Sequence, residues 1–517
     1  MGYAVSRGVL SWGRWIFVRA EMALLSRGSL YEIDTRAWLG ELGRRLGIQG
    51  PMTLDLVPDA ELDRLAGLGF QWVWLMGVWT TGMVGREVSR SLPGAIEHYR
   101  ESLPDLRIED VQGSPFAVQA YDVSPRLGGD EALAKVRKKL RTRGLKLMLD
   151  FVPNHTARDH GWVFCHSEYY VHGNEDALAR EPGNYARVET KKGSAVLAFG
   201  RDPYFPGWAD TFQLNHRHPG LREALMGEMT RVAERCDGLR CDMAMLLLPE
   251  VIKRTWGADD GVEADDKPFW PGAIERVRAA IPGTFFLAEA YWDLEGTLQE
   301  QGFNATYDKR LYDRLRGRDA RGVREHLRAG LEFQAKSARF LENHDEERAA
   351  AAFPEEVHRA AAVVTYLTPG LGFFHQGQLE GARVRPSIHL ARRANEPVDP
   401  GVQSFYGRLL ALLQQPAIPE GEWRLVECKE AWQGNPTWDR FIAFRWDHAS
   451  AAHLLIVVNY GPTQGQCFLE YPAGGATRFR DLMSSAVFDR EGDDLSTRGL
   501  YLDMPAWGFH VFQIVNV

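Results

Sequence analysis

The sequence predicts an eight-stranded parallel β/α barrel that carries a small inserted domain and a C-terminal domain of antiparallel strands. Three observations lead to this prediction. Short β-rich segments alternate with helical segments through most of the chain, a pattern typical of parallel strands with right-handed crossovers. One long segment rich in Gly, Pro and aromatic residues interrupts the alternation. From about Ile418 the pattern changes to strands separated by turn residues, which indicates an antiparallel domain.

Eight strand–helix units can be assigned in chain order, which fits a (β/α)8 barrel with insertions. The helices show apolar residues at helical spacing, as Leu133, Val136 and Leu140 do. The expected strands are residues 30–33, 72–76, 146–152, 238–243, 284–290, 303–307, 338–342 and 371–375. The expected helices are residues 59–66, 129–144, 219–236, 270–281, 323–333, 354–366 and 402–414.

Two further segments complete the predicted architecture. Residues 156–213 follow the third strand and are expected to form the inserted subdomain. The C-terminal strands are expected at residues 441–446, 453–458, 466–471 and 508–515, as in an antiparallel β-sandwich. The predicted domains are 1–155 for the first part of the barrel (N-terminal extension about 1–28), 156–213 for the insertion, 214–416 for the second part of the barrel and 417–517 for the sandwich.

The composition is that of a globular protein. Apolar residues make up 45% and charged residues 25% of the chain, which excludes disorder and fibrous classes. The net charge of −8, from 61 basic and 69 acidic residues, gives no reason to expect a nucleic-acid or anionic-membrane partner. Aromatic residues make up 11%, enough to supply platforms for a flat, amphipathic ligand such as a sugar, although most are expected to pack in the core.

Cysteine usage and the N-terminus favour a cytoplasmic protein. The odd count and scatter of the five cysteines argue against a disulfide framework, and their spacing does not suit a zinc site. The apolar run at residues 15–18 is too short for the core of a signal peptide. No apolar stretch approaches the roughly 20 residues of a membrane span. The cysteines are Cys165, Cys236, Cys241, Cys428 and Cys467.

Ionisable residues lie at the carboxyl ends of four of the eight expected strands or just beyond them. Because active sites of β/α barrels lie at the carboxyl ends of the strands, we expect these side chains to share one rim. Taken singly, each acidic residue is most simply a helix cap or a solvated charge. Together, such acidic residues need compensating partners or a functional role, since burying like charges close to one another is costly. The segments are Asp150-Phe151-Val152-Pro153-Asn154-His155, Arg240-Cys241-Asp242, Glu289 and Asn343-His344-Asp345, with Arg348 just beyond.

These segments resemble the motifs of the α-amylase superfamily, glycoside hydrolase family 13. Asp150 to His155 fits the first motif, D-x-V-x-N-H, and Gly238 to Asp242 fits the second, G-x-R-x-D. The third and fourth motifs are matched around Glu289 and by Asn343-His344-Asp345, and Gln213-Leu214-Asn215 resembles an auxiliary motif. Four motifs in this order, each after the expected strand, are specific, and the resemblance covers nearly the whole chain.

The resemblance implies a retaining enzyme in which Asp242 is the nucleophile and Glu289 the general acid and then base. Asp345 would bind sugar hydroxyls and support the oxocarbenium-like transition state. Such a mechanism needs one ionised and one protonated carboxyl group. Arg240 lies two residues before Asp242 and therefore on the same face of the strand, so we expect it to lower the pKa of Asp242. The neighbouring carboxylates are expected to raise the pKa of Glu289.

The resemblance also implies contacts with the sugar. His155 and His344 would donate hydrogen bonds to its hydroxyls, and Arg348 would do the same beside Asp345. Phe116 falls where the family places a stacking aromatic, with ordinary core packing as an equal alternative. Ala117 stands where many exo-acting α-glucosidases carry Asp, which weakens an assignment as an exo-acting α-glucosidase, and the choice between endo and exo action stays open.

We expect no cofactor and no metal. Gln213 stands where the family usually has an Asp, and Met245 and Leu246 replace the Lys and His of calcium-dependent relatives. Calcium prefers several carboxylate oxygens, so this site would be short of negative charge. Asp176 and Asp210 lie in the insertion and leave a calcium site possible but not favoured.

The expected reaction is hydrolysis of an α-glucosidic bond in an oligosaccharide or disaccharide. A transglycosylase or a sugar phosphorylase of the same superfamily is the alternative, because the rim loops set the acceptor. A non-catalytic carbohydrate-binding relative is disfavoured, because Asp242, Glu289 and Asp345 are all present. The expected partner is an α-glucoside, with no nucleic acid and no membrane, and the oligomeric state stays open.

Overall fold

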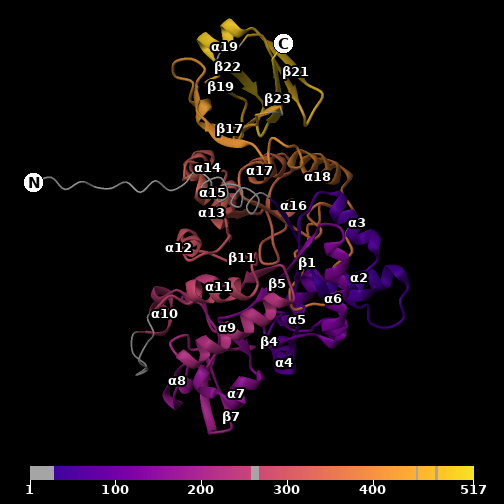
Figure 1. Cartoon of the computed structure of the whole chain (residues 1–517), viewed down its shortest axis with the longest axis vertical. Coiled ribbons are helices and arrows are strands. Elements are labelled where there is room, and N and C mark those ends of the chain that lie inside the picture. Colours follow the sequence, from indigo (N-terminus) through magenta and orange to yellow (C-terminus); the bar gives the residue numbers. More distant parts are fainter. Residues whose placement is uncertain (1–27, 258–266, 450–451, 472–474, 517) are drawn as a thin grey trace, which may run out of the picture.

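A computed structural model describes residues 28–257, 267–449, 452–471 and 475–516 of the 517-residue chain (Figure 1). The predicted N-terminal extension falls almost entirely on residues 1–27, which lie outside the described residues.

Eight parallel strands close into a barrel in the order β1-β14-β13-β12-β11-β10-β5-β2. Each strand overlaps a segment predicted for it, so the predicted barrel is confirmed. β13 ends at Arg339 and not at Glu342, which leaves the fourth motif on the loop that follows. The strands are β1 (Ser29–Asp34), β2 (Trp72–Met76), β5 (Lys146–Phe151), β10 (Gly238–Cys241), β11 (Phe285–Ala288), β12 (Ala305–Tyr307), β13 (Ser337–Arg339) and β14 (Leu371–His375).

Helices follow the barrel strands. The predicted helix over residues 323–333 is wrong, because the chain forms two shorter helices, α14 (Ala320–Leu327) and α15 (Leu331–Ala335), separated at Ala329-Gly330. The other helices of the barrel are α2 (Thr35–Leu46), α3 (Asp59–Gly67), α6 (Gly129–Arg141), α9 (Pro219–Glu234), α10 (Pro249–Trp256), α11 (Phe269–Ala280), α12 (Glu295–Glu300), α13 (Lys309–Arg316), α16 (Ala349–Ala352), α17 (Glu355–Leu367) and α18 (Pro400–Leu413).

Two excursions leave the barrel before β10. The first, after β2, contains the hairpin partners β3 (Trp79–Thr81) and β4 (Val118–Val123) with helices α4 (Met83–Ser91) and α5 (Ala95–Ser102) between them. The second is the predicted insertion after β5, which holds two antiparallel pairs. These pairs are β6 (His155–Ala157) with β9 (Thr211–Gln213) and β7 (Tyr185–Thr190) with β8 (Gly193–Ala198). Helices α7 (Gly161–Cys165) and α8 (Glu175–Arg180) lie beside β7 at the bottom of Figure 1.

The C-terminal antiparallel domain lies beyond α17 and α18, at the top of Figure 1. Alternate residues of β17 and β18 face two different cores: Phe444 and Ile456 join the core of the barrel, whereas Phe441 and Leu455 join a core within the domain. The six-stranded sheet is β15 (Glu422–Val426), β17 (Phe441–Asp447), β18 (His453–Asn459), β23 (Phe509–Asn516), β20 (Thr477–Asp481) and β21 (Val487–Arg490). The three-stranded sheet is β16 (Cys428–Glu430), β19 (Gly465–Leu469) and β22 (Leu500–Met504), with α19 (Gly492–Arg498) before β22.

Among the described residues, no helix combines the length and the apolar character that a bilayer crossing requires.

Candidate active site

One buried arginine joins two of the expected carboxylates. Arg240, on β10, is 0% exposed, and its Nη1 donates to Asp242 Oδ1 at 2.5 Å. Its Nη2 forms an ion pair with Glu289 Oε2 at 2.8 Å, and its Nε donates to the hydroxyl of Tyr307 at 3.2 Å. Arg240 and Asp242 face the same way because they lie two residues apart at the end of a strand.

The backbone beyond β10 and β11 holds the same two carboxylates. The Asp242 N–H donates to Phe151 O, and the Glu289 N–H donates to Cys241 O, so the strand ladder continues through both residues. Met243 then takes a left-handed conformation with φ 43°, and its N–H donates to Glu289 Oε2 at 2.6 Å. Such a conformation costs a non-glycine residue about 1–3 kcal/mol, so the turn after Asp242 is held under strain.

Burial dominates the pKa values of this pair. Burial raises the pKa of Asp242, and Arg240 opposes this only in part, so the expected lowering of that pKa is wrong. Burial also raises the pKa of Glu289, to about 7; Arg240 opposes the rise, and Asp242 and Asp345 add to it. Tyr291 hydrogen-bonds Glu289 Oε1 at 2.9 Å. Glu289 therefore carries a proton over much of the range below neutral pH.

The third carboxylate, Asp345, is the most open of the three, with 45% of its side chain exposed. Its Oδ2 lies 3.1 Å from His344 Nε2. Desolvation pushes the pKa of Asp345 upwards, but His344 and, more weakly, Arg240 and Arg385 outweigh it and lower the pKa to about 2. Asp345 is therefore an ionised group at the open side of the site.

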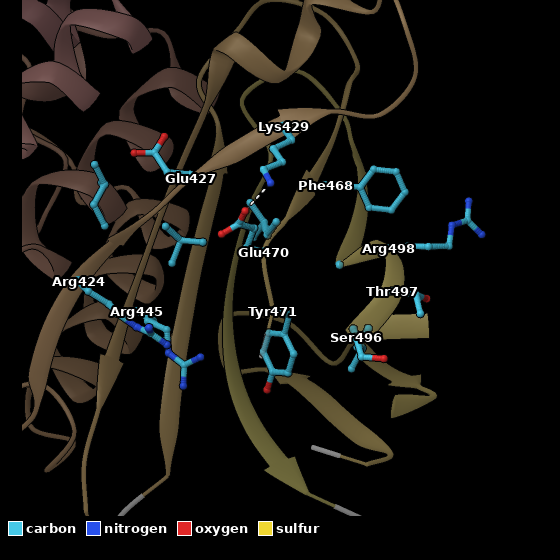
Figure 2. Close-up of a pocket in the computed structure, with 15 residues that line it drawn as sticks. Arg424, Glu427, Lys429, Arg445, Phe468, Glu470, Tyr471, Ser496, Thr497 and Arg498 are labelled. Carbon is cyan, nitrogen blue, oxygen red and sulfur yellow. Dashed lines mark ion pairs between the residues drawn. The ribbon is translucent and has the colours of Figure 1, made fainter. Parts of the chain in front are cut away.

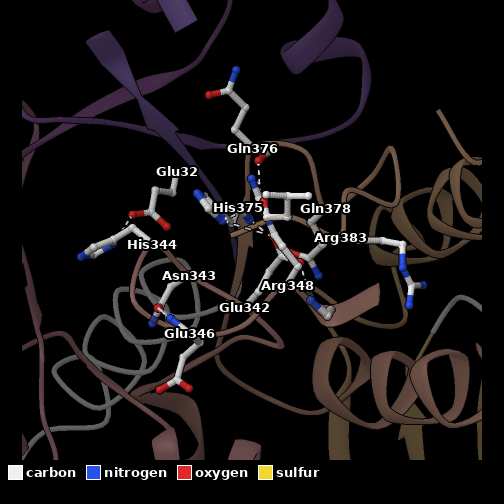
Figure 3. Close-up of polar contacts among 12 residues, drawn as sticks. Glu32, Glu342, Asn343, His344, Glu346, Arg348, His375, Gln376, Gln378 and Arg383 are labelled. Carbon is white, nitrogen blue, oxygen red and sulfur yellow. Dashed lines mark hydrogen bonds and ion pairs between the residues drawn. The ribbon is translucent and has the colours of Figure 1, made fainter. Parts of the chain in front are cut away.

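Glu32 is a member of the site that the sequence analysis missed. It lies on β1, is 0% exposed, and its Oε1 is 2.5 Å from His344 Nδ1 (Figure 3). The available signal was an acidic residue in the middle of a strand expected to be buried. Tyr291 was also missed, although it lies two residues after Glu289, the spacing that placed Arg240 beside Asp242.

His155 and Phe116 lie at the site as expected and are nearly enclosed. His155 is 4% exposed, its ring packs edge-on to Trp208, and burial lowers its pKa to about 4, so it is neutral. Phe116 is 9% exposed and lies 5.3 Å from the ring of His344 and 5.2 Å from the guanidinium of Arg240. Phe116 therefore packs against the charged groups, whatever contact it makes with a ligand.

The structure corrects the placement of Arg348. Its guanidinium is buried in a separate cluster, where Nη1 donates to Glu342 Oε1 at 2.5 Å and to Gln376 O at 2.8 Å (Figure 3). Glu342 is 0% exposed, so its buried charge requires a cation. The Arg348 side chain therefore points inward to Glu342. Arg385, from the loop after β14, takes the place expected for Arg348, since its Nη1 donates to the backbone oxygen of Asp345 at 2.6 Å.

A cavity of about 700 Å³ opens beside His344 and Asp345. Its wall also includes His98 and Tyr99 from α5 and Arg383 and Arg385 from the loop after β14. Its size lies within the range of about 300–1,000 Å³ typical of ligand pockets. Of the three carboxylates, Asp345 lines this space, which can hold a ligand.

A second cavity, of about 620 Å³, lies within the C-terminal domain (Figure 2). Its charged residues are largely paired: Lys429 with Glu470, and both Arg424 and Arg445 with Asp447. It is built only from residues 424–499 and contains none of the three carboxylates. It is therefore not the candidate active site.

Comparison with known proteins decides the family. The model of the α-amylase catalytic domain matches residues 60–387, more than half of the chain. The chain belongs to the α-amylase family. The predicted family is therefore confirmed.

The relatives share low identity with this member of the family. Alpha-amylase MalA of Haloarcula japonica is 25% identical over 478 residues, which cover 90% of this chain and 60% of that protein. Alpha-amylase 3 of Dictyoglomus thermophilum is 23% identical over 293 residues, covering 51% and 53%. The chain thus spans less than two thirds of the length of these relatives.

Solved structures support the fold. The noncanonic maltogenic α-amylase AmyB of Thermotoga neapolitana superposes with a TM-score of 0.69 at 19% identity, covering 96% of this chain and 100% of that one. An α-amylase from Lactobacillus plantarum has a TM-score of 0.63, also at 19% identity.

The residues at the position expected for calcium do not fit a calcium site. Gln213 Nε2 donates to Asn154 Oδ1 at 2.9 Å, and Asn154 Nδ2 donates to Gln213 Oε1 at 3.2 Å. Each amide oxygen therefore already accepts a hydrogen bond from the other amide. Within the described part of the chain, no group of three or more His, Cys, Asp or Glu residues is arranged to hold a metal ion. Calcium, which prefers carboxylate oxygens, would have to displace these amide hydrogen bonds.

Proposed function

We propose that this enzyme hydrolyses an α-glucosidic bond of an oligosaccharide or disaccharide with retention of configuration. The observation that carries the proposal is the single guanidinium of Arg240 between Asp242 and Glu289. Carboxyl groups that share one guanidinium lie close together. This favours the separation of about 5–5.5 Å typical of retaining enzymes over the roughly 6.5–9.5 Å of inverting ones.

In the first step, Asp242 attacks the anomeric carbon and forms a covalent glycosyl–enzyme ester. The bond to the leaving oxygen breaks, and Glu289 gives its proton to that oxygen. In the second step, Glu289 takes a proton from water, whose oxygen attacks the same carbon and releases Asp242. The raised pKa of Glu289, about 7, supports its role as the acid.

Asp345 and His344 would hold the hydroxyls of the sugar in the distorted ring of the transition state. An ionised carboxylate and a ring N–H provide one acceptor and one donor at the open side of the site. His155 and Phe116 would complete the contact with the sugar.

The configuration of the first-formed product tests this proposal. We expect proton NMR of a maltooligosaccharide digest to show the α-anomer first, followed by slow mutarotation. Asp242→Ala should lose activity, and azide should restore turnover by forming a β-glycosyl azide, because the small anion can enter the space left by the carboxylate. A first-formed β-anomer would mean inversion and reject Asp242 as nucleophile.

One observation favours phosphate as an alternative acceptor. Arg383 and Arg385 line the cavity beside Asp345 on the loop that follows the eighth strand, where β/α barrels frequently bind phosphate. Incubation with a panel of α-glucosides, with and without phosphate, separates the outcomes. Free glucose indicates hydrolysis, a sugar phosphate indicates phosphorolysis, and longer or isomeric sugars indicate transfer.

We also propose that the enzyme works in the cytoplasm. All five cysteines are free thiols, and four of them are buried, which suits a reducing compartment. Fractionation of the producing cells, with activity followed in each fraction, tests this assignment.

A further inference from the structure

The carboxylate of Glu32 is buried in the barrel with one polar partner. Glu32 lies beside Trp74 on β2 and His375 on β14 and is 0% exposed. Its Oε1 contacts His344 Nδ1 at 2.5 Å, whereas its Oε2 has no hydrogen-bond partner among the described residues. A buried carboxylate is costly unless a cation compensates it. His344 is the group that supplies this compensation.

His344 lies between two carboxylates and contacts one with each ring nitrogen. Nδ1 faces Glu32 at 2.5 Å, and Nε2 faces Asp345 at 3.1 Å. An ionised carboxylate only accepts hydrogen bonds, so a ring nitrogen that faces one must carry a proton. Two such contacts make the ring an imidazolium. The Nε2 contact is an ion pair without hydrogen-bond alignment, so the buried Nε2–H has no hydrogen-bond partner among the described residues.

The other groups around His344 leave this charge in place. Trp74 and Phe116 pack their rings against it at 5.4 Å and 5.3 Å, which excludes water. The charges that face it from neighbouring strands are Asp242 and Asp150, with Arg240 opposing them. Burial alone would lower the pKa of His344, but Asp345 and Glu32 raise it well above the ordinary value.

We propose that Glu32 is a positioning residue that fixes the ring of His344 through Nδ1 and keeps it an imidazolium, so that Nε2 is aimed at Asp345 and at the sugar. The role at the sugar rests on the proposed function, whereas the state of the ring does not. Glu32 itself touches neither the sugar nor the reacting atoms.

The ring can be observed directly. In protein with 15N-labelled histidine, the signal of His344 is assigned by its loss in His344→Gln. We expect both ring nitrogens to remain protonated at about pH 8, far above the ordinary histidine pKa of about 6.5. Glu32→Gln keeps the size and can still accept from Nδ1, but it removes the charge. In this variant we expect His344 to lose its proton at least one pH unit lower than in the wild type.

A matched control separates loss of charge at this ring from general damage. Asp308 is another buried carboxylate, and it contacts His326 Nε2 at 2.9 Å. Asp308→Asn should lower the melting temperature without changing the titration of His344. Glu32→Gln should also lower kcat/KM by about 10- to 100-fold, mainly through kcat, the size found when the supporting partner of a metal-bound histidine is removed.

A neutral His344 in the wild type at pH 8, or the same titration in Glu32→Gln, would overturn the proposal. The wild-type titration decides the point even if Glu32→Gln does not fold. The readout needs no turnover. An inactive protein with a doubly protonated His344 would therefore reject the proposed function and keep this inference.

Discussion

Arg240 determines how the carboxylates of the site coexist. It is fully enclosed, with the rings of Trp74 and Phe116 at 5.1 Å and 5.2 Å from its guanidinium. In such a low-dielectric setting, two carboxylates without a cation would both resist ionisation. Burial raises the pKa of both Asp242 and Glu289 even with Arg240 present. A substitution that moves or removes the guanidinium of Arg240 should therefore change both pKa values at once.

The proton on Glu289 has a consequence for stability as well as activity. Its pKa in the folded enzyme is about 7, above the ordinary value of 4.5. Between about pH 4.5 and pH 7 the folded protein holds a proton that the unfolded chain has lost, so this group makes the free energy of unfolding fall as pH rises. We expect Glu289→Gln to reduce the loss of stability between pH 5 and pH 8 in chemical denaturation.

The activity of the wild type should decline above about pH 7, as Glu289 loses its proton. Glu295→Gln is the control, because burial also raises the pKa of Glu295 to about 7, outside the site. It should change the pH dependence of stability and leave the alkaline limb of kcat/KM in place. A limb that moved in the control as well would mean that Glu289 does not set it.

At the scale of elements, much of the site followed from strand ends. The strands are marked by apolar and β-branched runs, and whatever follows them must reach one rim of a parallel barrel. This placed Asp242 and Glu289. Arg348 was misplaced because its direction depends on a tertiary partner, the buried Glu342, that sequence spacing does not identify.

The C-terminal domain shows the same limit. β17 and β18 are apolar on both faces and were predicted, whereas β20 was not. β20 alternates buried and exposed residues in the sequence Thr477-Arg478-Phe479-Arg480-Asp481, and its short, charged pattern resembles a loop until its neighbours are known.

The pairing of β6 with β9 predicts that the enzyme does not need calcium. This pairing sets His155 opposite Gln213 and lets the amides of Asn154 and Gln213 satisfy each other. We expect activity and melting temperature to be unchanged after exhaustive chelation. Gln213→Asp removes the Nε2 donor and adds a charge, so it should cost about 1–3 kcal/mol of stability.

Calcium should restore part of this loss in Gln213→Asp and have no effect on the wild type, as measured by thermal unfolding with and without the ion. A rise of several degrees in the wild type at micromolar calcium would show that the insertion holds a real site.

At the scale of the whole molecule, the barrel and the C-terminal domain form one packed body. Trp446 Nε1 donates to Leu367 O at 2.7 Å, and the Tyr460 hydroxyl donates to Leu315 O at 2.7 Å. Both contacts join the C-terminal domain to helices that cover the barrel. Because β17 and β18 also serve both cores, neither part can lose its packing without exposing the other.

We therefore expect a single unfolding transition, monitored by calorimetry and by loss of activity. Trp446→Phe should lower the free energy of unfolding by about 1–3 kcal/mol and move the whole transition to lower temperature, because the buried Leu367 carbonyl loses its hydrogen-bond donor. Trp432→Phe is the control, since Trp432 is 55% exposed in the same domain and should have little effect. Two separate transitions, with activity surviving the first, would contradict the coupling.

The contact between Glu32 and His344 can form only late in the synthesis of the chain. The two residues are 312 positions apart, on the first strand of the barrel and after the seventh. At about 5–20 residues per second, a ribosome adds His344 roughly 15–60 s after Glu32. Until then the carboxylate has no partner, and its strand cannot complete the barrel, because β14 is synthesised last. A charge that is fully enclosed in the finished protein therefore belongs to a group that the nascent chain must leave in water until synthesis of the barrel is nearly over.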